Sequence, residues 1–278
     1  MASPSRDQLE ARLRKRLSAF LNRSRPWRPV LDVIEKAADR RGWRPLLFGG
    51  TLRDLLIEGC PPPRDLDFVV PGASLDELRE ELGGHVERRT RFGGLRLRIR
   101  ALPVDIWPLE QTWAFARGLV ADPTPEALPR TTFLSAEAAA IELWPGRGRK
   151  RTLYTNGLFE SFASSCLEIN LEQNPYPELC VVRSLLTLRK LGFSAGPNLA
   201  RYLVEHGAHL SPRQLVDAQL AHYGNVLLAP ATLLADLACI RRQQEEGRAT
   251  VRLAQGAQRK LPCPTSSGAN LAEEPGRR

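Results

Sequence analysis

Long apolar runs are absent from the sequence, and no segment approaches the roughly 20 residues that cross a bilayer. The first residues also lack the apolar core of a secretory signal, so we expect a cytoplasmic protein with no membrane partner. Cysteines are few and odd in number, and their spacing contains no paired metal-ligand motif. The sequence therefore predicts a reduced intracellular protein without a zinc site.

Two catalytic signatures are missing as well. No Gly-x-x-x-x-Gly-Lys-Ser/Thr motif occurs, which excludes a P-loop nucleotide site. The histidines are too scattered to serve a nucleophile or a zinc ion, and we expect them at the surface or at helix ends. They are His85, His206, His209 and His222.

Positive charge is what the chain has in excess. Its 278 residues include 40 Lys and Arg, nearly all of them Arg, against 31 Asp and Glu, which gives a net charge of +9. The excess suggests a polyanionic partner, although a GC-rich genome also raises Arg usage. Ser5 to about Leu21 has a helical period with leucines on one side and arginines on the others. We interpret it as a solvated basic helix rather than a nucleic-acid arm.

The stretch from Leu46 to Val70 contains the strongest functional pattern. Leu46 to Phe48 is typical of a short buried strand, Gly49-Gly50 of a tight turn, and Thr51 to Glu58 of a helix that starts at that turn. Glycines let backbone N–H groups approach a ligand, and a helix N-terminus adds positive potential. The turn therefore favours phosphate.

Three carboxylates accompany this turn. Asp65 and Asp67 lead into the strand Phe68 to Val70, and side-chain alternation along a strand places both on one side. Asp105 stands on another predicted strand, Val104 to Trp107, where an inward apolar residue would be expected. Because carboxylates are hard oxygen ligands, we predict a two-Mg²⁺ site, which Mn²⁺ could also fill and which would bind substrate phosphates.

These residues give the chain a family resemblance. Gly49-Gly50-Thr51-Leu52-Arg53-Asp54-Leu55-Leu56, followed by Arg64-Asp65-Leu66-Asp67-Phe68-Val69, resembles the head domain of CCA-adding enzymes and bacterial poly(A) polymerases. Both belong to the polymerase-beta-like nucleotidyltransferase superfamily. The resemblance covers roughly Pro29 to Phe193. It implies an α+β fold, in which a mixed or antiparallel sheet flanked by helices is followed by a small helical neck.

We divide the chain into a basic N-terminal helix (1–25), the head (26–165), the neck (166–245) and a tail (246–278). The tail is rich in Pro, Gly, Ser and charge, which predicts disorder. Glu110 to Leu119 is expected to be helical, and Leu128 to Glu137 to form a turn followed by a strand or a short helix. From Pro175 onward the pattern is that of successive helices.

The resemblance also implies a mechanism. Asp65 and Asp67 would hold the metals on the triphosphate of ATP or CTP, while Gly49 and Gly50 cradle that triphosphate. Asp105 would bind the catalytic metal and help to deprotonate an acceptor hydroxyl, most naturally at the 3′ end of tRNA or of another RNA. The hydroxyl would attack the α-phosphate in line and pyrophosphate would leave.

Arg53 and Asp54 fall at the family's Arg-Asp pair and are nucleotide-binding candidates. Arg53 would face phosphate or pair with a motif carboxylate. The alternative is an ion pair that only stabilises the helix. The family's Arg-Arg-Asp-Phe-Thr-x-Asn motif is altered here, because Arg130 is kept as a binding candidate while Thr131 takes the acidic position and Ser135 the Asn position.

The base-reading Glu-Asp-x-x-Arg motif of the neck is altered too. Its acidic position falls on Pro177 and its Arg on Cys180, and only Arg183 remains nearby as a nucleotide-binding candidate. The chain thus resembles a divergent member with a short body. Two alternatives to RNA 3′-end transfer stay open: an acceptor hydroxyl on a small molecule or a protein, and a non-catalytic nucleotide- or RNA-binding module.

Overall fold

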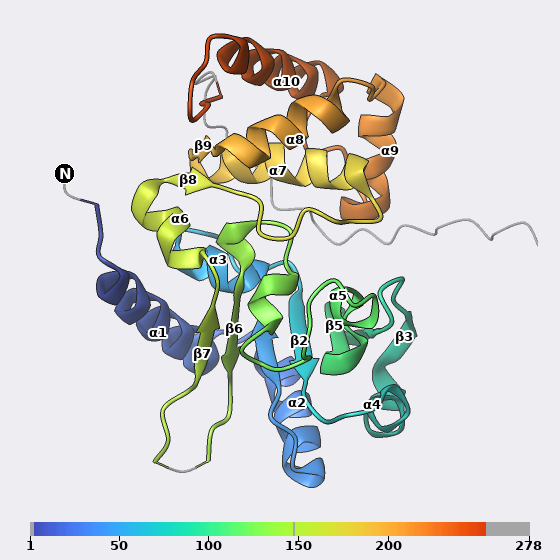
Figure 1. Ribbon diagram of the computed structural model, residues 1–278. Coiled ribbons are helices and arrows are strands. Elements are labelled where there is room, and N and C mark those ends of the chain that lie inside the picture. Colours follow the sequence, from blue (N-terminus) through green and yellow to red (C-terminus); the bar gives the residue numbers. More distant parts are fainter. Residues whose placement is uncertain (1–2, 147, 254–278) are drawn as a thin grey trace, which may run out of the picture.

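A computed structural model describes residues 3–146 and 148–253 of the chain (Figure 1). The fold is α+β, as predicted: a mixed sheet flanked by helices forms the head, and a group of helices forms the neck above one end of that sheet. None of the helices in the described residues is both long enough and apolar enough to cross a membrane.

The described part of the head contains a seven-stranded sheet in the order β3-β4-β5-β2-β1-β6-β7. Neighbouring strands are antiparallel except β2 and β5, which run parallel at the centre. The strands are β1 (Leu46–Phe48), β2 (Leu66–Val70), β3 (Val86–Arg89), β4 (Leu95–Ile99), β5 (Leu102–Pro108), β6 (Ala139–Glu142) and β7 (Leu153–Thr155).

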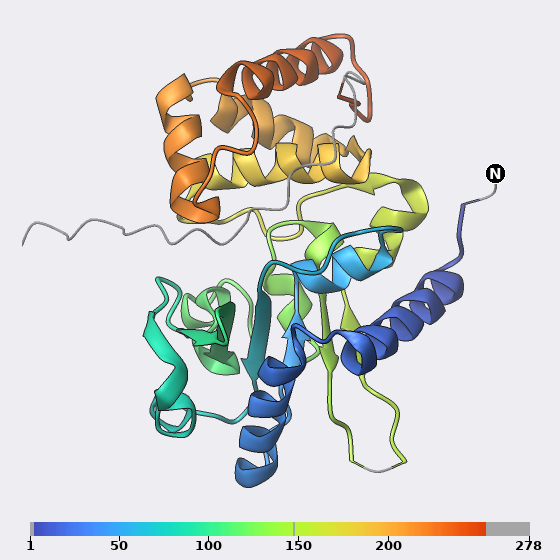
Figure 2. The same cartoon turned by 180° about the vertical axis from the view of Figure 1, so that it is seen from behind.

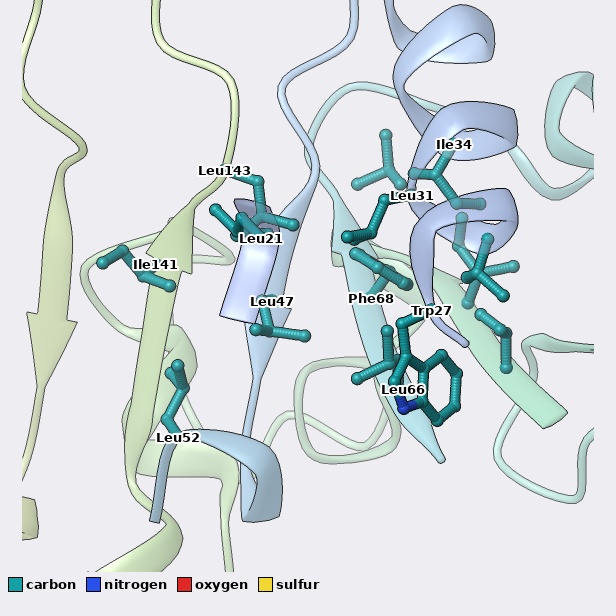
Figure 3. Close-up of a cluster of buried hydrophobic side chains, with 14 of the residues drawn as sticks. Leu21, Trp27, Leu31, Ile34, Leu47, Leu52, Leu66, Phe68, Ile141 and Leu143 are labelled. Carbon is teal, nitrogen blue, oxygen red and sulfur yellow. The ribbon is translucent and has the colours of Figure 1, made fainter. Parts of the chain in front are cut away.

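Two long helices cover one face of this sheet, as the view from behind shows (Figure 2). Their apolar side chains meet the inward residues of the strands in one core, where Trp27, Leu31 and Ile34 pack near Leu66 and Phe68 (Figure 3). The head helices are α1 (Arg6–Arg23), α2 (Arg28–Arg41), α3 (Gly50–Leu56), α4 (Leu75–Leu82), α5 (Trp113–Ala116) and α6 (Leu158–Ser164).

The N-terminal helix α1 is part of the head rather than a separate solvated segment. Ser5 caps it through a capping box with Gln8. Its leucines, Leu9, Leu13, Leu17 and Leu21, are buried in the same core as β1 and β2. The basic side contributes as well, since Arg14 donates to the Arg151 carbonyl at 2.9 Å. This packing corrects the interpretation of α1 as a free basic helix.

The other face of the sheet is covered by short elements. Val69 and Leu46 pack there with Phe115 and Leu128. The helix expected over Glu110 to Leu119 is limited to α5 and the 3-10 turn η2 (Leu109–Gln111). The segment expected as a turn and a strand or short helix forms two 3-10 turns, η3 (Leu128–Thr131) and η4 (Ser135–Glu137).

The neck has a core of its own. Its helices are α7 (Pro177–Leu191), α8 (Pro197–Gly207), α9 (Pro212–Tyr223) and α10 (Pro230–Glu245). Two short parallel strands, β8 (Cys166–Leu167) before α7 and β9 (Ser194–Ala195) after it, pair with each other. Arg189 of α7 donates two hydrogen bonds of 2.6 Å to Asp236 of α10.

The segment just after α10 is ordered. Val251 is buried and pairs with Ala195, so the prediction of a disordered tail from residue 246 is wrong for this segment. Residues 254–278 lie outside the described residues.

Aromatic and charged contacts join the head to the neck. Phe92, in the turn between β3 and β4, meets Tyr176 at the start of α7 with ring centroids 5.9 Å apart. Phe162 of α6 meets Phe193 after α7 at 5.2 Å. Lys190 of α7 pairs with Asp54 of α3 at 2.8 Å. The neck is therefore held against the end of the sheet at which β2 begins.

The packing of α1 gives a stability prediction. We expect Leu13→Ala to lower the free energy of unfolding by about 2–5 kcal/mol, because it leaves a cavity in the head core. Urea denaturation measures the change. The matched control is Leu119→Ala, at a side chain that is 37% exposed, and it should cost no more than about 0.5 kcal/mol. Equal effects of the two substitutions would show that α1 does not belong to the core.

Candidate active site

Two of the three predicted carboxylates are brought side by side by strand pairing, and the third stands close by in the sequence. In the parallel register of β2 and β5, Asp67 lies opposite Asp105 and Leu66 opposite Val104. Leu66 and Val104 point into the main core, so the alternation of the strands turns both carboxylates to the opposite face. Asp65 precedes β2 by one residue and stands two positions before Asp67.

Burial and the nearby negative charges raise the pKa values of two of these groups, Asp67 and Asp105. Burial raises the pKa of Asp67 well above its ordinary value, and the charges of Asp65 and Asp105 raise it further. Burial also raises the pKa of Asp105 to about 6, although the nearby Arg96 opposes that shift. The ionised forms of Asp67 and Asp105 are therefore less stable in this site than they would be in water.

Arginines pair with two of the three carboxylates. Arg96 lies opposite Asp105 on β4, with Nε 2.5 Å from Oδ1. The orientation of the two groups does not satisfy a hydrogen bond, so the buried Oδ1 of Asp105 has no hydrogen-bond partner among the described residues. Arg64 donates to Oδ2 of Asp65 at 2.8 Å. Asp67 makes no ion pair with any described residue.

The donor set fits a divalent cation in its chemistry. Carboxylate oxygens are the ligands that Mg²⁺ prefers. The buried Oδ1 of Asp105 has Arg96 as an ion-pair partner but accepts no hydrogen bond from the described residues. A cation would also relieve the repulsion of Asp67 by Asp65 and Asp105. As the side chains stand, no three acidic, histidine or cysteine groups of the described residues converge on one point. The side chain of at least one of the three carboxylates would therefore have to move before all of them could share a cation.

The Gly49-Gly50 turn is built as predicted, with one correction. Gly49 has a φ of 75°, a conformation that favours glycine, and it precedes the first turn of α3. Its N–H already donates to the Ala139 carbonyl of β6 at 3.0 Å. The expectation that this amide is available to phosphate is therefore corrected. At Gly50 an added Cβ would be in ordinary van der Waals contact with the Arg53 guanidinium, 3.5 Å away.

Arg53 and Asp54 belong to a network of charges that connects head and neck. Arg53 donates to Asp54 at 2.8 Å and to the buried Glu137 of η4. Arg183 of α7 donates to the other oxygen of Glu137 at 2.6 Å. Burial opposes the charge of Arg53, but Asp54 and Glu137 outweigh it and raise its pKa. Arg53 thus pairs with the carboxylates of Asp54 and Glu137 in this structure and does not point free toward a phosphate site.

The remaining predicted residue lies apart. Arg130 is exposed in η3, and its side chain makes no hydrogen bond or ion pair with any described residue.

Two cavities in the described part of the chain lie away from the three carboxylates. One of about 620 Å³ is lined by Arg25, Arg28, His85 and Arg100 among others, and one of about 380 Å³ lies between α1, α3 and the three consecutive prolines. Neither is lined by the carboxylates.

Three residues at this site were missed from the sequence. Glu137 gave no local signal, because its partners lie 84 and 46 residues away. His222 is exposed at the end of α9, as expected for a helix-terminal histidine, but the charges of Arg183, Arg64 and Asp65 all act on it. Tyr223 beside it lies under the guanidinium of Arg64, 5.1 Å from the ring centroid.

Comparison with known proteins agrees with this architecture. No family model and no curated protein matches the chain. Among solved structures, the apo form of a tRNA-processing enzyme is 18% identical with a TM-score of 0.53, over 80% of this chain and 58% of its own. A tRNA nucleotidyltransferase complexed with a primer tRNA and an incoming ATP analogue is 19% identical with a TM-score of 0.52, over 76% and 61%.

The Thermotoga maritima CCA-adding enzyme complexed with tRNA is 18% identical with a TM-score of 0.51, over 74% of this chain and 48% of its own. The chain thus spans about half to three-fifths of the length of these neighbours. The predicted fold is confirmed: the chain has the fold of CCA-adding and other tRNA nucleotidyltransferases over the aligned part.

The raised pKa of Asp67 predicts a pH-dependent stability. An aspartate whose pKa is raised in the folded protein is harder to ionise there than in the unfolded chain, so stability is lost as the pH rises through the folded pKa. We expect Asp67→Asn to be more stable than wild type at pH 8 in EDTA by about 1 kcal/mol, the usual size of the effect of one substitution, because the neutral amide removes a charge that burial and the neighbouring carboxylates disfavour. At pH 5 the gain should shrink.

Urea denaturation across this pH range measures the effect. Asp217→Asn, at an exposed position of α9, is the control for the loss of one negative charge. A gain that stays constant from pH 5 to pH 8 would contradict the assignment of repulsion to Asp67.

Proposed function

We propose that this protein is a nucleotidyltransferase that transfers a nucleoside monophosphate from ATP or CTP to the 3′ hydroxyl of an RNA, with release of pyrophosphate. The observation that carries the proposal is the pairing of Asp67 with Asp105 on parallel strands, with Asp65 adjacent, in a tRNA-nucleotidyltransferase fold. Carboxylates held together at this point of the fold favour a role in catalysis, because they cost stability where they stand.

Asp65, Asp67 and Asp105 would hold Mg²⁺, and Mn²⁺ would suit the same oxygen ligands. When bound, the cation supplies positive charge that offsets the charge of the triphosphate and of the leaving pyrophosphate. Asp105 would also help to take up the proton of the attacking hydroxyl, as the resemblance implies. Arg64 and Arg96 would turn from these carboxylates toward phosphate oxygens as the nucleotide binds.

RNA is the acceptor best supported by the charge of the chain. A net charge of +9, carried mostly by Arg, favours a phosphate backbone as partner. Two of the solved structures with this fold are complexes with tRNA. We therefore propose tRNA, or another RNA with an accessible 3′ end, as the acceptor.

A second candidate keeps the transfer and changes the acceptor to a hydroxyl of a small molecule or a protein. It is favoured by the altered neck motif, because Cys180 is only 4% exposed within α7 and cannot contact a base. The two candidates separate when labelled nucleotide is offered with RNA, protein and metabolite fractions in parallel.

The transfer reaction gives the central test. Wild type is incubated with each labelled NTP, Mg²⁺ and total RNA, and we expect label at RNA 3′ ends. Asp67→Asn should reduce the rate by at least about 100-fold, because the charge it removes cannot be replaced by a neutral amide. Asp217→Asn should retain the wild-type rate. Label that enters only protein or metabolites would support the second candidate and contradict RNA as the acceptor. Label in no fraction would contradict nucleotidyl transfer altogether.

Metal binding can be tested without turnover. We expect Mg²⁺ to raise the melting temperature of wild type, because it binds the folded carboxylates. The rise should vanish in Asp67→Asn and persist in Asp217→Asn. A rise of the same size in all three proteins would show that the cation binds elsewhere.

A further inference from the structure

A basic cavity of the head lies away from the candidate catalytic carboxylates. Its volume of about 620 Å³ is in the usual range of ligand pockets. Ile99 of β4 is part of its lining and belongs to the core on the helix-covered face of the sheet, as do Leu66 and Val104. Asp67 and Asp105 point to the opposite face. A ligand in this cavity would therefore not lie beside the carboxylates.

The cationic side chains of the cavity come from segments that are distant in the sequence. Arg25 belongs to the connection between α1 and α2, Arg28 to the first turn of α2, and Arg100 to the turn between β4 and β5. His85, the last residue of the 3-10 turn η1 (Gly83–His85), also lines the cavity. The fold thus gathers three guanidinium groups and an imidazole around one space.

The carboxylate at the cavity does not balance these charges. Asp32 is the only acid among the described residues that line it, and it pairs with Arg28 at 2.7 Å. Arg25 and Arg100 make no hydrogen bond or ion pair with any described residue. Positive charges gathered without partners repel each other, and a bound anion would offset that repulsion.

The turn that carries Arg100 has a backbone conformation that is costly for its sequence. Ile99 pairs with Leu102, so Arg100 and Ala101 alone connect the two strands. Their φ angles are 48° and 67°, in the left-handed region where such turns prefer Asn and Gly. Arg98 braces the turn by donating to the Ala101 carbonyl at 3.4 Å. A strained backbone of this kind is typical of ligand sites, which favours a use for the Arg100 guanidinium.

The connection that carries Arg25 is anchored in the core. Trp27 is 1% exposed and packs near Leu66 (Figure 3). Its N–H also donates to the Ser24 carbonyl at 3.1 Å. Leu21, at the other end of the connection, is buried in the same core. Arg25 is therefore presented to the cavity by a fixed stretch of backbone.

We propose that this cavity is a second binding site, which takes a ligand that carries phosphate groups. Guanidinium groups bind phosphate oxygens through charge-assisted hydrogen bonds. Pro29, Val33 and Ile99 supply an apolar part of the lining, against which a carbon part of the ligand can pack. The phosphate can belong to a free nucleotide or to the backbone of an RNA, since both present the same anionic oxygens. The inference does not depend on nucleotidyl transfer.

Equilibrium binding in EDTA tests this site without metal-dependent binding at the carboxylates. Full-length wild type, Arg25→Ala and Arg100→Gly are titrated with fluorescent ATP and with a labelled single-stranded RNA whose 3′ end is blocked. We expect each substitution to weaken one of these ligands by about tenfold, because a hydrogen bond between charged groups is lost. A loss for ATP identifies a free nucleotide as the ligand. A loss for the RNA alone, with a salt dependence that becomes less steep, identifies the RNA backbone.

Two controls exclude other causes. Arg117→Ala removes an exposed arginine of the head that does not line the cavity, and it should bind both ligands like wild type. Arg100→Gly places glycine at a φ of 48°, so its melting temperature without ligand should not fall. Unchanged binding of both ligands in Arg25→Ala and Arg100→Gly, or an equal loss in Arg117→Ala, would overturn the site.

Combining Arg100→Gly with Asp67→Asn shows where the ligand binds. Because the two residues belong to separate sites, Arg100→Gly should weaken binding by the same factor with and without Asp67→Asn. A loss that disappears in the Asp67→Asn background would place the ligand at the carboxylates and overturn the second site. A wild type that transfers no nucleotide but shows the expected dependence on Arg100 would contradict the proposed function and support this site.

Discussion

Burial of Asp67 beside Asp65 and Asp105 is the constraint on which the rest of the site depends. The parallel register of β2 and β5 fixes the two backbones side by side, so the carboxylates cannot separate without breaking the centre of the sheet. Arg96 and Arg64 offset part of this charge from a neighbouring strand and from the residue before Asp65. The core on the far side, with Leu66, Phe68 and Val104, supplies the stability that keeps the arrangement in place.

Ion pairs and an aromatic contact join the neck to the part of the head that carries these carboxylates. Glu137 accepts from Arg53 of the head and Arg183 of the neck, and Lys190 reaches Asp54 from α7. Removing one member of a buried pair of this kind costs about 3–5 kcal/mol, because the other charge is left uncompensated. On the other side Arg64 meets Tyr223. Helix α7 is therefore tied to α3 and η4, and helix α9 to the residues just before β2.

Much of this arrangement could be predicted from the sequence. The succession of strand, glycine turn, helix and strand from Leu46 to Val70 is local, because period and turn residues reveal it. Asp105 could be recognised as a carboxylate in an apolar strand. Where the chemistry of a position is set by its neighbours in the chain, the sequence predicts the structure well.

The residues that escaped prediction depend on distant partners. Glu137 stands in an alanine-rich segment, and nothing nearby indicates that two arginines will share it. His222 and Tyr223 look like an ordinary helix end until the neck folds over Arg64. The same reason explains α1, whose arginines suggested a solvated helix although its leucines complete the head core. Periodicity shows which face is apolar, but not which surface will cover it.

The shared carboxylate of Glu137 has a consequence for the modularity of this fold. A head and a neck that exchange partners by recombination must bring matching charges, because a foreign neck without a cation at the position of Arg183 would leave half of the Glu137 charge uncompensated in a dry interior. A foreign head without an acid at Glu137 would leave Arg183 and Arg53 facing each other. A stable chimaera of this head or neck with a foreign partner therefore has to keep the pairing of Glu137 with Arg183.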